Sequence, residues 1–255
     1  MFMGNRKCTV VLMGLIGGAM VLGAAASQGT VIYQDTFPGS SANPLSGTSP
    51  SIDTGGATWT AGLPASGGWA ANGSTPGGGG FQYASLPFAT PAVSGGTYSV
   101  SGTLDPTGTT DSWLAIGFSN GSGFFSGVGP WMLLQDNGPI QLFAGPGTGG
   151  GPGNPAGTFS LGQTAEVVLN TTVADWTAEY YYNGISLGTY TYTGVGGSNP
   201  NPTGITTVGI GTNSEPGIVG DFMFQNSVVP EPATLGLMAA MGAGLLLLGR
   251  KRPQA

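Results

Sequence analysis

Short apolar runs separated by glycine- and proline-rich turns extend through most of this chain, and this pattern constrains the fold more than any other feature. The 255 residues include 50 glycines and 19 prolines, a fraction that can signal disorder. The runs between the turns, however, are rich in β-branched and aromatic residues, and between residues 27 and 228 none has a helical period. We therefore expect an all-β domain of about a dozen strands.

The clearest local signal is a pair of aromatic-rich runs, 176–182 and 185–192, joined by Asn183 and Gly184. Asn-Gly between two such runs favours a type I′ hairpin, because both residues tolerate positive φ. Alternation along the first run predicts one face toward the core and one toward the surface. The predicted core face holds Trp176, Ala178, Tyr180 and Tyr182, and the predicted surface face holds Thr177, Glu179 and Tyr181.

The order of these elements resembles the concanavalin A-like or laminin G-like jelly roll. The matching features are an early Asp-Thr-Phe at 35–37, a central apolar strand at 113–118, the hairpin from Trp176, and a final strand at 220–224. The resemblance covers about residues 30–226. It implies two antiparallel sheets packed face to face, with the first and last strands paired, and the strand spacing favours the same arrangement.

The N-terminal end has the pattern of an export signal. Arg6 and Lys7 precede an apolar run at 10–22, and three alanines follow at 24–26. A charged, then apolar, then small-residue order is typical of a secretory signal peptide. We expect residues 1–26 to form a signal helix that signal peptidase removes.

The C-terminal end contains Val229, Pro230, Glu231 and Pro232, then 17 uncharged residues at 233–249 and the basic cluster Arg250, Lys251 and Arg252. As a helix the uncharged run would reach about 26 Å, and the basic side chains can extend to the membrane interface. Proline on both sides keeps Glu231 extended. The pattern predicts a transmembrane helix with its basic end in the cytoplasm.

This tail resembles the PEP-CTERM sorting signal of biofilm-forming Gram-negative bacteria. The resemblance implies processing by an exosortase-type enzyme that recognises the Val-Pro-Glu-Pro segment. It divides the chain into a signal peptide (1–26), a β-sandwich ectodomain (27–228) and a sorting tail (229–255). The expected location is the membrane, through the C-terminal helix, before processing, and the cell surface or extracellular matrix afterwards. A plain C-terminal anchor is the alternative.

The charge pattern excludes several functions. All five basic residues lie in the two end segments, there is no histidine, and ten acids remain between Ser27 and Val229. Nucleic-acid binding is excluded because phosphate neutralisation needs lysine or arginine. Histidine-dependent catalysis and histidine or cysteine zinc sites cannot form there. The single cysteine, Cys8, lies in the signal peptide, so the exported part has no disulfide.

Two aspartates are candidates for a structural Ca²⁺. Asp35 and Asp221 each precede an aromatic residue, in the first and last expected strands. If these strands pair, both carboxylates could contribute to a site completed by backbone carbonyls, since Ca²⁺ prefers oxygen ligands. The alternative is two solvated acids at strand ends. We expect no other cofactor.

We carry three functional hypotheses. The first is a non-catalytic exported surface or matrix protein, retained in exopolysaccharide. The second is a carbohydrate-binding module that uses exposed aromatics, with Tyr181 beside Glu179 as the favoured pair. The third, a glycoside hydrolase, needs two carboxylates flanking a sugar, and the Glu-x-Asp-x-x-Glu pattern of jelly-roll glycosidases is absent; we therefore expect no enzyme activity. The other aromatic candidates are Trp59, Trp69, Trp131, Tyr180 and Tyr182.

Overall fold

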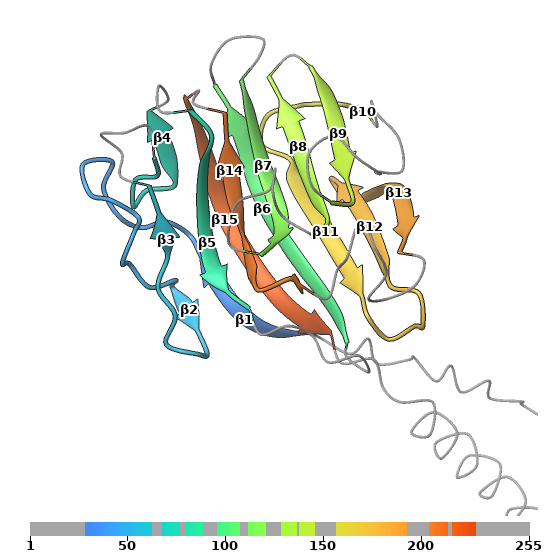
Figure 1. Cartoon of the computed structure of the whole chain (residues 1–255). Helices are drawn as coiled ribbons and strands as arrows, with labels where there is room; N and C mark the ends of the chain where they lie inside the picture. Colours follow the sequence, from blue (N-terminus) through green and yellow to red (C-terminus); the bar gives the residue numbers. More distant parts are fainter. Residues whose placement is uncertain are drawn as a thin grey trace, which may run out of the picture.

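The computed structural model describes residues 29–62, 68–76, 80–88, 96–107, 112–120, 129–136, 138–145, 157–192, 204–213 and 216–227. Every regular element in these ranges is a β-strand, and all pairings are antiparallel. The strands form two sheets that lie face to face (Figure 1). The expected all-β, two-sheet antiparallel sandwich is confirmed.

The larger sheet has eight strands in the described part of the chain. Its order across the sheet is β13 (Ile185–Thr191), β12 (Thr177–Tyr182), β11 (Thr164–Asn170), β6 (Thr97–Pro106), β15 (Pro216–Ser227), β1 (Thr30–Asp35) and β2 (Ile52–Asp53), with β4 (Ser74–Pro76) also paired to β15.

The other sheet has seven strands in the same described ranges. Its order is β10 (Gly157–Thr158), β9 (Pro139–Phe143), β8 (Trp131–Gln135), β7 (Trp113–Ser119), β14 (Thr207–Thr212), β5 (Gln82–Pro87) and β3 (Thr60–Ala61). The chain passes between the sheets from β5 to β6 to β7 and again from β14 to β15, which makes the sandwich jelly-roll-like.

The first and last strands pair, as expected. Thr30 lies opposite Asn226 and Asp35 lies opposite Phe222, with an irregularity in β15 where Asp221 has φ of 49°. Because β1 and β15 run antiparallel, the beginning of β1 and the end of β15 lie side by side at one end of the sandwich (Figure 1). The end of β6 and the beginning of β15 pair with each other at the other end of the sandwich, where β14 ends beside the beginning of β7.

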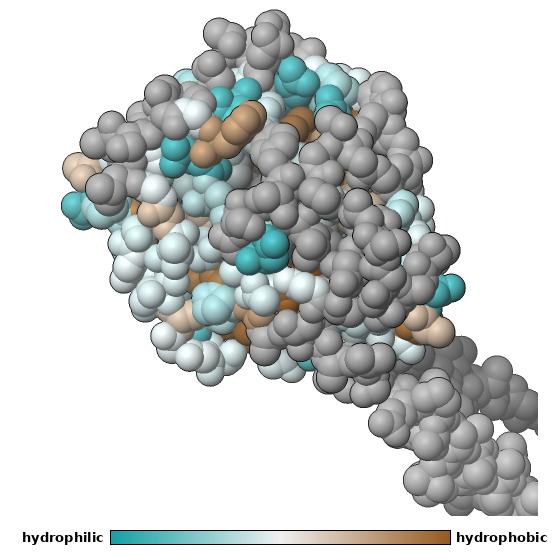
Figure 2. All heavy atoms as spheres, in the orientation of Figure 1, coloured by the Kyte–Doolittle hydropathy of each residue, from teal (hydrophilic) through white to brown (hydrophobic). Residues whose placement is uncertain are grey.

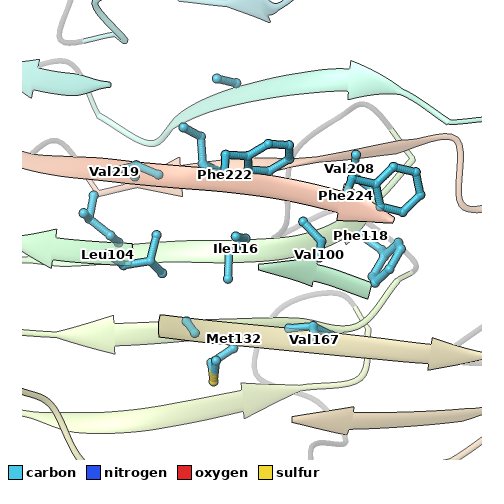
Figure 3. Close-up of a cluster of buried hydrophobic side chains, with 14 of the residues drawn as sticks. Val100, Leu104, Ile116, Phe118, Met132, Val167, Val208, Val219, Phe222 and Phe224 are labelled. Atoms are coloured by element: carbon cyan, nitrogen blue, oxygen red, sulfur yellow. The ribbon is translucent and has the colours of Figure 1, made fainter. Parts of the chain in front are cut away.

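Apolar side chains from both sheets fill the space between them (Figure 3). Burial of this surface removes apolar area from water and supplies most of the driving force for folding. Gly102 on β6 leaves room for Ile116 of the opposite sheet, whose Cδ1 lies 3.3 Å from the position of an added Cβ. The labelled residues of Figure 3 are Val100, Leu104, Ile116, Phe118, Met132, Val167, Val208, Val219, Phe222 and Phe224.

Tyrosine hydroxyls link the two sheets. Buried tyrosines need a partner for the hydroxyl, and backbone carbonyls on or beside the seven-stranded sheet supply it. Burial raises the pKa of Tyr180 and of Tyr192 far above the ordinary value, so both remain donors. The pairs are Tyr33 with Pro87 (2.8 Å), Tyr180 with Phe143 (2.6 Å) and Tyr192 with Ala144 (2.7 Å).

The β12–β13 hairpin has the predicted turn. Asn183 and Gly184 have φ of 51° and 73°, and Tyr182 pairs with Ile185 across the turn, which is the backbone of a type I′ turn. Trp176, Tyr180 and Tyr182 are buried, so the predicted core face is confirmed.

Both predicted end segments lie outside the described residues. They are the signal helix at the N-terminal end and, at the C-terminal end, the Val229–Pro232 segment, the predicted helix and the basic cluster Arg250, Lys251 and Arg252. Within the described ranges there is no helix with the length and apolar character needed to span a bilayer.

Candidate functional site

The structure places Asp35 in the core and Asp221 at the surface. Asp35 is 2% exposed. Its Oδ2 accepts a 2.8 Å hydrogen bond from Trp59 Nε1, and its Oδ1 accepts from the Phe37 backbone N–H at 2.8 Å and from Ser51 Oγ at 3.3 Å. Asp221 is exposed in the β15 irregularity. The carboxylates lie on adjacent strands but in different environments.

This arrangement does not fit a Ca²⁺ shared by the two aspartates. Ca²⁺ needs several oxygen ligands around one point, whereas both oxygens of Asp35 already accept hydrogen bonds from protein groups. Among the described residues, no group of three or more acidic, histidine or cysteine side chains could hold a metal. Asp35 instead anchors Trp59 and the left-handed residue Phe37, whose φ is 52°.

Tyr181 and Glu179 lie together on the outer face of the eight-stranded sheet, as predicted. Glu166 on β11 lies opposite Tyr181, and Ser186 donates a 3.1 Å hydrogen bond to Glu179. The pKa of Tyr181 is raised to about 12. The largest cause is desolvation, followed by a hydrogen bond with Glu179 and the negative charges of Glu179 and Glu166. The tyrosine is therefore a neutral donor beside two carboxylates.

The tryptophans suggested as sugar-stacking candidates are not exposed. Trp59, Trp69 and Trp131 are all buried, and so are Tyr180 and Tyr182. The burial of these rings rules them out as surface platforms in this arrangement. Among the sugar-stacking candidates named from the sequence, Tyr181 alone is not buried.

A second hydrophobic cluster lies on the outer face of the seven-stranded sheet. Ala115, Trp131, Leu133 and Phe143 form it, and the rings of Trp131 and Phe143 stack with centroids 3.8 Å apart. Along β7 and β8 these side chains alternate with side chains that face the core, because Leu114, Met132 and Leu134 belong to the core cluster. Tyr83 and Trp113, both half-buried, pack against the margin of this outer cluster.

At that margin an aromatic pair reaches the surface. Phe81, immediately before β5, is 68% exposed, the most exposed of the large hydrophobic side chains in the described ranges. Its ring stacks on Trp113 at the start of β7, with centroids 5.9 Å apart and an interplanar angle of 27°. We call these two residues the aromatic platform. On the side shown in Figure 2, the coloured apolar surface is confined to small, separate areas.

Sequence reasoning missed this platform. Phe81 and Trp113 are each found at the entry to an apolar strand, where period-2 alternation does not assign a face. The two come together because β5 and β7 both pair with β14: Gly211 lies opposite both Tyr83 and Ala115. A local signal for the platform would have been the aromatic residue at the entry of each strand, Phe81 just before β5 and Trp113 as the first residue of β7.

Charge is distributed unequally between the sheets. None of the described strands of the seven-stranded sheet contains a carboxylate or a basic residue. The acids found within strands all belong to the eight-stranded sheet: Asp35, Asp53, Asp105, Glu166, Glu179 and Asp221.

Comparison with family models and with curated proteins finds no match. Among solved structures, the chain is similar to the carbohydrate recognition domain of Emp47p (13% identity, 81% of this chain and 100% of that chain, TM-score 0.44). It is also similar to an endo-1,3-beta-glucanase from Streptomyces sioyaensis (13% identity, 80% of this chain and 98% of that chain, TM-score 0.49). A third similar structure is the carbohydrate-binding module CBM66 from Bacillus subtilis (8% identity, 77% of this chain and 97% of that chain, TM-score 0.42). At these identities and scores the matches assign no activity to this chain.

Proposed function

We propose that this chain is an exported, non-catalytic cell-surface or matrix protein whose sandwich binds polysaccharide through exposed aromatic side chains. The observation that carries the binding role is the aromatic platform, in which an exposed phenylalanine lies on a tryptophan at the margin of an uncharged sheet. Aromatic faces present apolar area with defined geometry, which suits the C–H faces of sugar rings.

The export part of the proposal rests on the two end segments. Both basic clusters lie in them, and the sequence between has neither a cysteine nor a positive charge. A signal peptide followed by a cysteine-free domain and a tail of the PEP-CTERM type is the simplest reading. It makes signal peptidase and an exosortase-type enzyme the processing partners, and exopolysaccharide the retained ligand.

The non-catalytic part rests on the placement of the acids. A glycosidase needs two carboxylates about 5–10 Å apart on either side of the scissile bond. The described strands next to the aromatic platform carry none, and Glu166 and Glu179 lie on the other sheet beside Tyr181. The Tyr181–Glu179 pair is a second candidate contact for sugar, through hydrogen bonding rather than stacking.

The binding role is tested by affinity electrophoresis of the full chain in gels that contain polysaccharide, including exopolysaccharide from the host. We expect retardation, and Phe81→Ala should weaken it by roughly threefold to tenfold, since an aromatic stack is worth about 0.5–1.5 kcal/mol. Leu161→Ala is the matched control, because Leu161 is 64% exposed. Tyr181→Phe tests the second candidate. Equal retardation of Phe81→Ala and wild type would contradict the assignment to the aromatic platform.

The sorting role is tested by intact-mass analysis of the protein from its host, with cells and matrix separated. A matrix species that begins at Ser27 and ends near Pro232 is expected. A full-length C-terminus found only in membranes would show that the tail is a plain anchor.

A further inference from the structure

We infer that the ligand at the aromatic platform is an uncharged glycan, held by stacking and neutral hydrogen bonds with no ionic contact. This inference rests on the proposed function, and it specifies the chemical class of the ligand.

The first argument is the absence of cations from the sequence. Between Ser27 and Val229 there is no lysine, arginine or histidine, so no loop of this part can bring a positive charge to the platform. Carboxylate or sulfate groups on a polysaccharide would therefore find no positively charged partner. They would also lose hydration on approaching the protein without compensation, which is unfavourable.

The second argument is the chemistry around the platform. In the described ranges the polar side chains placed beside Trp113 by hydrogen bond and strand register are amides. Asn213 Oδ1 accepts a 3.1 Å hydrogen bond from the Trp113 backbone N–H. Gln135 pairs with Trp113 across β7 and β8. Side-chain amides both donate and accept, as sugar hydroxyls do.

The third argument concerns a charge that lies nearby. Asp136 directly follows β8, and its backbone N–H donates a 2.9 Å hydrogen bond to the carbonyl of Ser112, the residue before Trp113. A carboxylate at this position repels an anionic polymer.

The test is isothermal titration calorimetry of the full chain with neutral, anionic and cationic polysaccharides. The neutral panel contains a β-1,3-glucan, a β-1,4-glucan, a galactomannan and dextran; the anionic probe is alginate and the cationic probe is chitosan. We expect at least one neutral polymer to bind with a Kd that changes less than about twofold between 50 mM and 1 M NaCl, because no counterions are released. Phe81→Ala should weaken that binding by roughly threefold to tenfold, and Leu161→Ala should not.

The outcomes separate the two proposals. If only alginate binds, with or without added Ca²⁺, and Phe81→Ala abolishes the binding, the platform binds polysaccharide but the uncharged class is wrong. The same holds if only chitosan binds in a Phe81-dependent manner. If no polymer of any charge binds, the proposed function itself fails.

Discussion

Trp59 donates a 2.8 Å hydrogen bond from its indole Nε1 to Oδ2 of Asp35, and both side chains are buried in the core. A single carboxylate thus holds a large aromatic ring and the backbone of Phe37. Phe37 and Phe222 both pack near the Trp59 ring, with centroids 5.9 and 5.0 Å from it. The anchor joins β1 to the loop that contains Trp59.

Asp35→Ala should strongly destabilise the domain. The substitution leaves the Trp59 indole and the Phe37 N–H buried without an acceptor, and each unsatisfied donor costs about 1–3 kcal/mol. We expect a loss of roughly 2–5 kcal/mol in urea denaturation. Asp53→Ala is the control, since the Asp53 carboxylate accepts a 2.8 Å hydrogen bond from Gly55 at an exposed position. Similar losses for the two variants would contradict the anchor role.

The same experiment tests the calcium alternative for Asp35. If protein donors alone hold this carboxylate, a chelator should leave the denaturation midpoint of the wild type unchanged. A chelator that lowers wild-type stability to the level of Asp35→Ala would instead show that a metal supports the residue.

Stability should fall as pH rises from about 10 to 12. Unfolded tyrosine ionises near 10, whereas the pKa of Tyr83 and of Tyr181 is raised to about 12 in the folded protein. In this window the folded state retains protons that the unfolded state releases, so unfolding is favoured by rising pH. The contribution is complete below pH 10 and is lost as pH passes 12.

The Glu179→Gln variant tests how much Glu179 contributes to the raised pKa of Tyr181. Removing this charge should bring the pKa of Tyr181 back toward 10, because Glu179 both accepts a hydrogen bond from the phenol and repels its anion. Absorbance at 295 nm reports tyrosine ionisation, and Tyr181→Phe assigns the change. An unchanged late titration in Glu179→Gln would show that burial, together with Glu166, raises the pKa of Tyr181 without Glu179.

Gly102 and Ile116 should be energetically coupled. A valine at position 102 would meet Ile116 Cδ1 and the Gly220 carbonyl, which lie 3.3 and 3.4 Å from the added Cβ, and overpacking typically costs about 1–3 kcal/mol. In an Ile116→Ala background the same Gly102→Val change should cost less, because the cavity receives the new methyl groups. Urea denaturation of the four proteins gives the coupling, and we expect about 1 kcal/mol or more. Additive losses would show that the two sheets do not meet at this pair.

Local sequence patterns predicted much of this architecture. The hairpin followed from Asn183-Gly184, and the proximity of Tyr181 and Glu179 followed from period-2 alternation; neither depends on distant parts of the chain. The β1–β15 pairing was implied by the resemblance to the jelly roll. These features are confirmed by the turn dihedrals and the strand register.

The remaining features depend on contacts between distant segments. From the sequence alone, Asp35 is interpreted as a solvated acid at the end of a strand. It is buried because the loop that carries Trp59, 24 residues later in the chain, packs over it. The aromatic platform likewise joins the entries of two strands that are not neighbours in sequence. Alternation assigns a side chain to a face but does not say which face is later covered, and for that reason the burial of Trp131 on an outer face was not predicted.

The side-by-side position of Thr30 and Asn226 determines how the domain would bear a load. The aromatic platform lies toward the end of the sandwich where β14 leads into β15, opposite the end where β15 finishes. A protein held by its C-terminus and pulled by a ligand at the platform is therefore stretched along its strands. The tension acts on β15 between β1 and β6, so their hydrogen bonds share the force in shear instead of opening one after another. If the protein is retained in polysaccharide as we propose, this geometry makes its extraction by a moving polymer difficult.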